Sequence, residues 1–278
     1  TIVKIMAPMG LRRVRLTGGE PLVRKDLPRL VDLIASVPGI QDLAISTNAV
    51  LLENLAQPLK DAGATRVNIS LDSFREDRVD ALARRPGTFR KVLAGLEAAE
   101  KAGLEPIKIN VVLLRGKNDD EIQDFAEATR DRPWHVRFIE IMPTAANLDL
   151  SADDFVSCQE ALDQLRVLGD LEAVSGPEGN GPAVYHRFPR AKGTVGVITP
   201  MSHNFCDDCN RLRLTADGQL RPCLFGSLQT NLRDPLRAGK DLLPLILETL
   251  RTKPERHDLV QGSDAGSGGL IALSQTGG

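Results

Sequence analysis

Three of the four cysteines in this 278-residue chain lie close together in its last third. Cys206 and Cys209 form a CxxC pair, and Cys223 follows after residues 210–222. A CxxC pair can grip a metal centre from a tight turn, and clustered cysteines outside a secreted protein indicate metal before disulfides. Three thiolates suit a [4Fe–4S] cluster with one iron left open to substrate, since a cubane normally takes four cysteines. The spacing equally allows structural zinc with His203 as a fourth ligand, and both interpretations stay open at this point.

Two arginines follow the CxxC pair. Arg211 and Arg213 alternate along an expected strand, so their side chains point to the same face. Guanidinium groups bind phosphate through planar, bidentate hydrogen bonds. Two of them beside a metal site therefore predict a polyanionic ligand, with a solvated strand face as the alternative. The remaining cysteine, Cys158, lies in the amphipathic stretch Asp153–Leu168 and is predicted to be an ordinary packed residue.

Polar residues also gather at or near the ends of five expected strands in the first half of the chain. The five groups are Thr17–Pro21, Ser46–Asn48, Ser70–Asp72, the Lys108 and Asn110 pair, and Glu140–Pro143. Any one of them could be only a turn or a helix cap. The carboxyl edge of the sheet holds the active site in parallel α/β folds, so five groups in succession predict a site at that edge.

The elements that must position these residues alternate between strand and helix, which is typical of a parallel sheet. The expected strands are Val14–Leu16, Leu43–Ile45, Val67–Ser70, Ile107–Leu113 and Val136–Ile141. The expected helices are Leu27–Ser36, Leu51–Ala62, Thr88–Ala102 and Asp119–Arg130.

The pattern changes after residue 150, so we expect one domain over residues 1–150 and a second over residues 151–278. The second part opens with a Gly/Pro-rich loop at Ser175–Pro182. Its expected strands are Val195–Thr199, Leu212–Thr215 and Leu220–Cys223, with a hairpin turn at Asp217-Gly218, and its expected helices are Leu232–Ala238 and Leu242–Arg251.

Composition narrows the classes of function. Hydrophobic residues make up 42% of the chain and charged residues 26%, which is ordinary for a soluble globular protein. The net charge of −2 argues against broad binding to nucleic acid but allows a local basic pocket. No apolar run approaches the roughly 18 residues that a membrane span needs. The chain begins at Thr1 in mid-pattern, with a helix-like Ile2–Met9 segment and no targeting peptide, so we expect further residues upstream.

Several motifs, in this order along the chain, resemble the GTP 3′,8-cyclase family of radical S-adenosylmethionine (SAM) enzymes, which open molybdenum cofactor biosynthesis. These motifs are Arg15–Pro21, Asn68–Asp72, Lys108–Asn110, Arg137–Pro143, Ile198–Ser202, Cys206–Arg213 and the terminal Gly277-Gly278. The resemblance implies an α/β fold: an incomplete (β/α) radical SAM barrel over residues 1–150 and a small α+β iron–sulfur domain over residues 151–278.

The resemblance also implies a lyase reaction. One cluster reduces SAM to a 5′-deoxyadenosyl radical, the radical removes the ribose 3′-hydrogen of GTP, and C3′ then attacks C8 of guanine. The expected product is (8S)-3′,8-cyclo-7,8-dihydroguanosine 5′-triphosphate. A second [4Fe–4S] cluster holds the guanine on its open iron.

The resemblance also implies a role for each residue that matches a family motif. The expected SAM contacts are Gly19, Ser70 and Met142, and the expected GTP contacts are Arg15, Ser46, Lys108, Arg211 and Arg213. The expected cluster ligands are Cys206, Cys209 and Cys223. The expected catalytic residues are Arg211, Arg213 and the tail residues Gly277 and Gly278.

The chain departs from the family pattern in a few places. It has no CxxxCxxC motif for the SAM-reducing cluster, and Ala49 replaces a usual glycine. We therefore expect the first barrel strand and the cluster loop to be missing, the edge of Val14–Leu16 to be open, and the chain as given not to cleave SAM. The tail, Ser274–Gly278, lacks the apolar residue expected before its glycines.

Two alternatives to this enzyme are a degenerate or truncated paralogue that binds GTP without radical chemistry, and another twin-cluster radical SAM enzyme. The Asn210–Arg213 segment and the terminal glycines argue against the second. The expected downstream partner is cyclic pyranopterin monophosphate synthase, with no nucleic acid or membrane partner, and a homodimer is allowed. We expect the cytoplasm for a bacterial protein and the mitochondrial matrix for a eukaryotic one.

Overall fold

The structure is a computed structural model that describes residues 1–142, 151–179, 181–203, 205–207 and 209–256. Gly277 and Gly278, which the resemblance places in the active site, lie outside these residues. Among the described residues, no helix combines the length and the apolar character that a membrane span requires.

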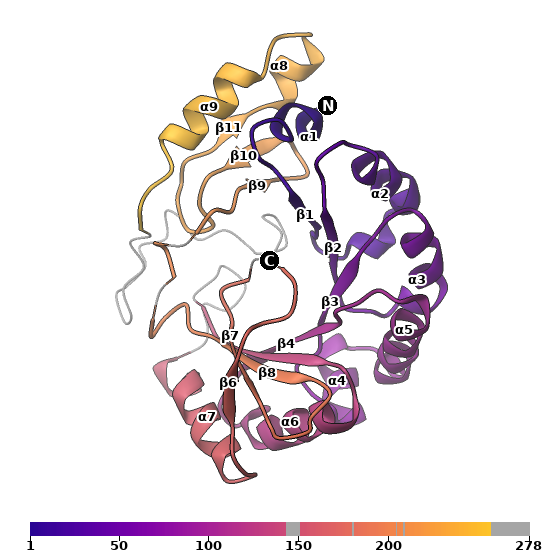
Figure 1. Ribbon diagram of the computed structural model, residues 1–278, viewed down its shortest axis with the longest axis vertical. Coiled ribbons are helices and arrows are strands. Elements are labelled where there is room, and N and C mark those ends of the chain that lie inside the picture. The colour runs from indigo at the N-terminus through magenta and orange to yellow at the C-terminus, as the bar shows by residue number, and fades with distance from the viewer. Residues whose placement is uncertain (143–150, 180, 204, 208, 257–278) are drawn as a thin grey trace.

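An eight-stranded sheet forms the centre of the molecule (Figure 1). Its strand order is β1 (Arg13–Leu16), β2 (Asp42–Thr47), β3 (Arg66–Ser70), β4 (Lys108–Leu113), β5 (His135–Glu140), β8 (Thr194–Ile198), β7 (Val184–Arg187) and β6 (Glu172–Val174). Strands β1 to β5 and β8 run parallel, whereas β7 and β6 are antiparallel to their neighbours. The α/β prediction is confirmed. The sheet continues past residue 150, and a domain division at that residue stays a prediction.

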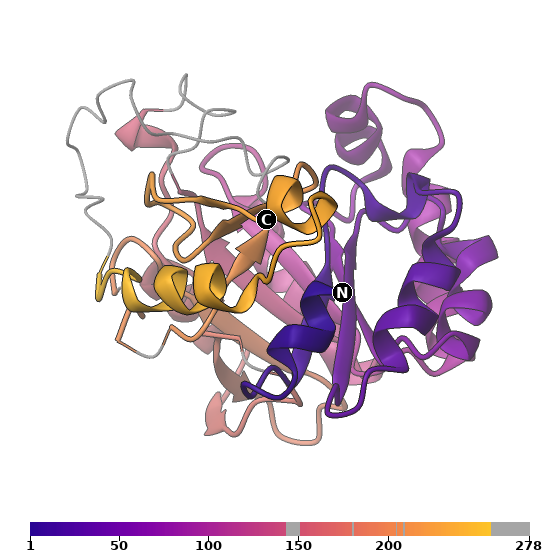
Figure 2. The same ribbon diagram turned by 90° about the horizontal axis from the view of Figure 1, so that it is seen from above.

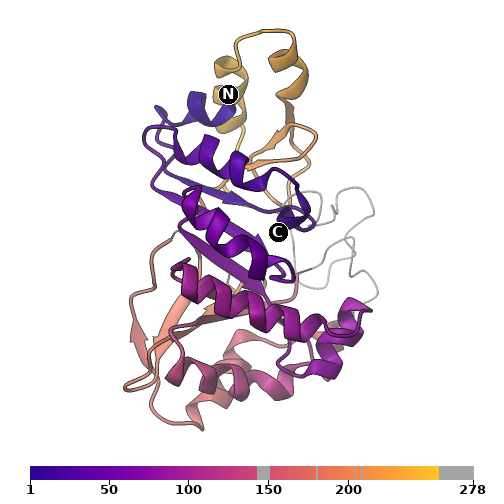
Figure 3. The same ribbon diagram turned by 90° about the vertical axis from the view of Figure 1, so that its right-hand side faces the viewer.

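Helices cover the outer face of this sheet, as Figures 1 and 3 show. They are α2 (Leu27–Ala35), α3 (Leu52–Asp61), α4 (Glu76–Ala83), α5 (Thr88–Ala102), α6 (Ile122–Asp131) and α7 (Cys158–Arg166), with short 3-10 helices at Pro21–Val23, Asp119–Glu121 and Ala152–Asp154. The main core contains the fully buried strand residues Ile45, Val67, Ile69, Val111 and Phe138. Because strand side chains alternate between faces, the residues between them point to the inner face.

A smaller unit follows the main sheet. It is a three-stranded antiparallel sheet in the order β11 (Thr230–Asn231), β10 (Gln219–Arg221), β9 (Arg213–Leu214), backed by α8 (Arg233–Arg237) and α9 (Leu243–Arg251). Its own core is formed by Leu220, Leu232, Leu242 and Ile246. The first helix, α1 (Ile2–Met6), packs its apolar residues against this second core. Figure 2 shows α1 beside the C-terminal elements, so the beginning of the chain holds the small unit against the sheet.

Most expected elements are present, including the turn at Asp217-Gly218, where Gly218 has φ +86°. Helix α7 begins at Cys158, later than the amphipathic pattern predicts, because Ser157 and Glu160 form a capping box there. The sequence pattern does not predict α4, β6, β7 or β11. Helix α4 buries only Val79, and β6 buries no residue, so neither carries a strong hydrophobic period.

Candidate active site

The inner face of the sheet is basic. Arg15 on β1, Arg66 on β3, Lys108 on β4 and Arg137 on β5 all belong to it. Arg66, Lys108 and Arg137 are 5%, 2% and 3% exposed, respectively. Four strands thus place cationic side chains on one concave surface, where a soluble protein rarely buries charge without a partner.

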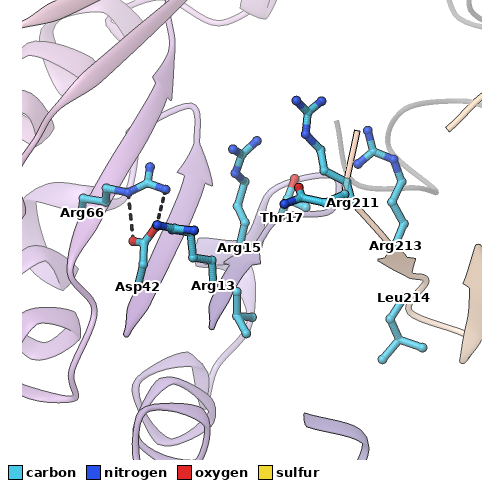
Figure 4. Close-up of a pocket in the computed structure, with 10 residues that line it drawn as sticks. Arg13, Arg15, Thr17, Asp42, Arg66, Arg211, Arg213 and Leu214 are labelled. Atoms are coloured by element: carbon cyan, nitrogen blue, oxygen red, sulfur yellow. Dashed lines mark hydrogen bonds and ion pairs between the residues drawn. The ribbon is translucent and has the colours of Figure 1, made fainter. Parts of the chain in front are cut away.

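The C-terminal hairpin adds two more cations. Arg211 and Arg213 line a pocket together with Arg13, Arg15 and Arg66. In Figure 4 the guanidinium groups of Arg15, Arg211 and Arg213 point to the same side. The predicted common face of Arg211 and Arg213 therefore looks onto β1, far away in the sequence.

Crowding of like charges perturbs these groups. Burial, together with the charges of Arg66 and Arg137, lowers the pKa of Lys108 to about 7. The surrounding protein and four other arginines lower the pKa of Arg15 to about 9, although its side chain still meets solvent through the pocket. Both groups become easier to protonate when an anion enters, so the pocket favours a polyanionic ligand.

Among the described residues that line the arginine pocket, Asp42 is the one carboxylate. Its two oxygens accept hydrogen bonds from Arg66, with Nε–Oδ1 at 2.9 Å and Nη2–Oδ2 at 2.7 Å (Figure 4). Burial opposes ionisation of Asp42, but the hydrogen bonds and charge of Arg66 outweigh it and lower the pKa of this carboxyl. Asp42 therefore pairs with Arg66 and offsets only part of the effect of burial and like charge on Lys108.

A glycine-rich loop packs against the same cations. Lys108 Nζ donates a hydrogen bond of 2.5 Å to the carbonyl oxygen of Glu178. A Cβ on Gly179 would lie 2.9 Å from Lys108 Nζ and 3.2 Å from Arg66 Nη2, and Gly179 has φ +127°. Only glycine lets the backbone come this close in this conformation. The predicted loop at Ser175–Pro182 thus contributes Gly181 and Pro182 to the wall of the site.

A second pocket joins this cationic surface to the cysteines. Cys206, Cys209 and Cys223 line it together with Arg15 and Arg137, and its further lining includes Asn110, Met142, Arg211 and Arg213. Asn110 Oδ1 and Arg137 Nε are buried and have no hydrogen-bond partner in the part of the chain that the structure describes. Unpaired buried polar atoms cost free energy, so their presence at this pocket indicates a polar ligand.

The three thiols are free and half-buried around this pocket. Within the described ranges, no three His, Cys, Asp or Glu side chains converge closely enough to share one metal ion. His203 is exposed and does not line the pocket. A single zinc ion needs converging ligands, whereas a cubane binds each thiolate at a different iron. Three thiols around one pocket are a donor set that an iron–sulfur cubane accepts.

Electrostatics around the cysteines differ between Cys209 and Cys158. Burial opposes ionisation of Cys209, but a backbone hydrogen bond from Arg211 and the charges of Lys253 and Arg211 outweigh it and lower the pKa of the thiol. Burial and the nearby Glu140 raise the pKa of Cys158 to about 12. Cys158 is 1% exposed and packs in the interior, as predicted.

The expected SAM residues do not share one pocket. Ser70 lines a pocket at the carboxyl ends of β1 to β3 together with Glu20 and Asn48, whereas Met142 lines the cysteine pocket. Glu20 accepts hydrogen bonds from Thr47 Oγ1 at 2.7 Å and Asn48 N at 2.8 Å, which ties the turn after β1 to the end of β2. The neighbouring Gly19 leaves open space where a Cβ would stand.

The remaining expected residues lie on the inner face. Asn68 Nδ2 lies 3.4 Å from Ser46 Oγ, next to the cations. Lys108 is the first residue of β4, so it lies at the amino end of the strand and not at the carboxyl edge where the strand-end argument had put it. Arg66 and Arg137 were missed as site residues. The sequence contained the pattern that would have identified Arg66, since Arg66, Asn68 and Ser70 alternate on one strand and so share a face.

Comparison with known proteins places these residues in a family. The model described as "Radical SAM superfamily" matches residues 1–129, and the model described as "Molybdenum Cofactor Synthesis C" matches residues 134–259. The GTP 3′,8-cyclase of Pelotomaculum thermopropionicum is 46% identical over 266 residues, which cover 94% of this chain and 82% of the relative. This chain belongs to the GTP 3′,8-cyclase family. The fold is accordingly the α/β radical SAM fold, with a parallel sheet and a small C-terminal antiparallel sheet.

Two further GTP 3′,8-cyclases support the assignment. The enzyme of Moorella thermoacetica is 45% identical over 94% of this chain and 81% of its own length. That of Alkaliphilus oremlandii is 41% identical over 100% of this chain and 85% of its own length. The resemblance predicted from the motifs is confirmed, and the molybdenum cofactor match contains all three pocket cysteines with Arg211 and Arg213.

The Asp42–Arg66 pair should stabilise the fold in a pH-dependent way. We expect Asp42→Asn to lower the free energy of unfolding by about 2 kcal/mol, less than the roughly 3–5 kcal/mol of a fully buried pair. The pKa of Asp42 is lowered in the folded state, so this contribution is present above the unfolded pKa and is lost as pH falls through the folded pKa. Urea unfolding at neutral and acidic pH measures both effects.

The exposed pair Arg24–Asp26, at 2.9 Å with side chains 53% and 57% exposed, is the matched control. Asp26→Asn should change stability by less than about 1 kcal/mol. Equal effects of the two substitutions would contradict the role given to Asp42.

Proposed function

We propose that this chain acts on GTP through the two adjoining pockets, in the reaction that forms (8S)-3′,8-cyclo-7,8-dihydroguanosine 5′-triphosphate for molybdenum cofactor biosynthesis. The observation that carries the proposal is the meeting of strand cations, hairpin arginines and three cysteines at one place. Membership in the GTP 3′,8-cyclase family supports the same reaction. The downstream synthase, a homodimer and the cellular compartment stay predictions.

The triphosphate is the part of GTP that matches the cations. Arg15, Arg211 and Arg213 approach it from two sides, with Lys108 and Arg137 deeper on the sheet. Phosphate oxygens would take the guanidinium hydrogen bonds in bidentate fashion and offset the burial and the repulsion that lower the pKa of Lys108 and Arg15. Ser46 adds a hydroxyl to the same face.

The guanine and ribose would lie in the cysteine pocket. The buried Asn110 Oδ1 can accept a hydrogen bond from a ligand, and Arg137 Nε can donate one. Cys206, Cys209 and Cys223 would hold a [4Fe–4S] cluster, which supplies an open iron that can bind the base. The role of this chain is to fix the base and the triphosphate at the same time, because holding reacting groups in the right orientation lowers the barrier to their reaction.

SAM would bind at the carboxyl ends of β1 to β3, and its reductive cleavage would need an electron from a cluster whose CxxxCxxC ligands this sequence does not contain. The open space at Gly19 lets a ligand approach the backbone, and Ser70 offers a hydroxyl. Met142 would contribute from the cysteine pocket, on the side that faces GTP. Catalytic roles for Gly277 and Gly278 remain part of this proposal.

The nature of the metal centre is the first test. After anaerobic reconstitution we expect about four iron and four sulfide per C-terminal site and no stoichiometric zinc. Cys223→Ser should lose most of this cluster, because one of three thiolates is gone. Cys158→Ala is the control and should keep it, since Cys158 lies outside the pocket. Stoichiometric zinc without sulfide would refute the cluster.

Loss of one hairpin arginine should weaken GTP binding. Arg213→Ala removes a charge-assisted contact worth about 1.5–3 kcal/mol, so the Kd for GTP should rise roughly tenfold or more. Calorimetric titration of the reconstituted protein with GTP measures this. Arg237→Ala, at an exposed site on α8, should leave the Kd unchanged. GTP binding that is insensitive to Arg213→Ala in a folded protein would show that these arginines are only a solvated face.

GTP binding should take up a proton at Lys108. The pKa of Lys108 is about 7 without ligand, and a bound phosphate raises it, so affinity should fall as pH rises above 7. Lys108→Arg keeps the charge and should remove this dependence, while Lys108→Met should remove it and also weaken binding. Titrations in two buffers of different ionisation enthalpy count the protons. A flat pH profile for the unmodified chain would exclude this role.

A further inference from the structure

Lys253 follows α9 and reaches back to the segments that carry the cysteines. Its Nζ donates hydrogen bonds to the carbonyl oxygens of Arg211, at 2.9 Å, and Pro222, at 2.8 Å. The same atom lies 3.7 Å from Cys209 Sγ. An ammonium group has three N–H donors, so two can hold the carbonyls while the third points to sulfur.

These contacts begin where the hairpin ladder ends. Strands β9 and β10 pair only at Leu214 with Leu220 and at Arg213 with Arg221. Arg211 lies two residues after Cys209, and Pro222 directly precedes Cys223. Beyond the ladder, the Lys253 ammonium is therefore a direct link between the backbone of the CxxC segment and the backbone that carries the third thiol.

Helix α9, which precedes Lys253, is fixed to the rest of the C-terminal unit. Ile246 is fully buried in the second core, and Thr249 Oγ1 is hydrogen-bonded to Thr230 Oγ1 at 2.7 Å. Arg256, just beyond Lys253, pairs with Asp207 inside the CxxC motif at 3.0 Å, although both side chains are more than half exposed and add little stability. The residues that follow α9 thus contact the cysteine segment at two points.

The positive charge of Lys253 has a second effect, on the reduction potential of the cluster. Thiolates and the cluster that they bind carry negative charge, which increases by one on reduction. A fixed positive charge beside one of the sulfurs stabilises the more negative state, since Coulomb attraction is strong where water is partly excluded. Hydrogen bonds and charges near the sulfurs are among the factors that set cluster potentials.

We propose that Lys253 is a positioning residue for the C-terminal cluster. Its ammonium group holds together the two segments that carry the cysteine ligands and raises the reduction potential of the cluster. This inference rests on the proposed cluster at Cys206, Cys209 and Cys223. Both effects need a flexible side chain that ends in a compact positive charge, and lysine has such a side chain.

The test compares Lys253→Met, Lys253→Gln and Lys253→Arg in the whole, anaerobically reconstituted chain. Lys253→Met should shift the reduction potential to a more negative value in an EPR-monitored redox titration, and should lose iron to a chelator several-fold faster. Lys253→Gln removes the charge but keeps amide donors, so it should shift the potential with a smaller effect on iron loss. Lys253→Arg should stay closer to the unmodified protein in potential. Lys240→Met, at an exposed position, is the control and should change neither property.

Unchanged potential and unchanged iron loss in Lys253→Met would overturn the inference. If Lys253→Met does not fold, as judged by circular dichroism, the same comparison is decided by the glutamine and arginine variants. Failure of the proposed function is seen separately, because the unmodified chain would then hold no cluster before any variant is compared.

Discussion

Lys108, Arg66 and Arg137 are each at most 5% exposed, and they lie within electrostatic reach of one another on the inner face of the sheet. Burial of like charges is unfavourable, because each loses hydration and repels its neighbours. The apolar outer face of the same strands compensates for this, since its residues pack with the helices into one continuous core. A β-strand can present both surfaces at once only because its side chains alternate.

A contact between distant parts of the chain brings further cations to this surface. Helix α1 packs on the core of the C-terminal unit and so brings the hairpin with Arg211 and Arg213 over β1. The three cysteines of the second pocket lie on the segments next to the same hairpin. A ligand held by the arginines is therefore also next to the cysteines, which is the arrangement that a reaction joining two parts of one nucleotide requires.

The carboxylates near this surface are engaged in other contacts. Asp42 is ion-paired with Arg66, and Glu140 accepts backbone hydrogen bonds from Cys158, Met201 and Ser202. Glu140 thus holds the loop that leads to Cys206 and does not offset the charge of the inner face. The excess of positive charge persists at the pocket, where an incoming polyphosphate would neutralise it.

Local patterns in the sequence determined most of the strands and helices, the trio of cysteines, the shared face of Arg211 and Arg213, and the family. These properties depend on side-chain period and motif spacing, which are contained in short segments. Tertiary structure decided the rest. Strand register and the packing of the two cores decided four features. These are the addition of β6–β8 to the main sheet, the place of Lys108 at the amino end of β4, the separation of Met142 from Ser70, and the approach of Lys253 to Cys209. Such contacts join residues far apart in the chain, and only the packing of the whole molecule selects them.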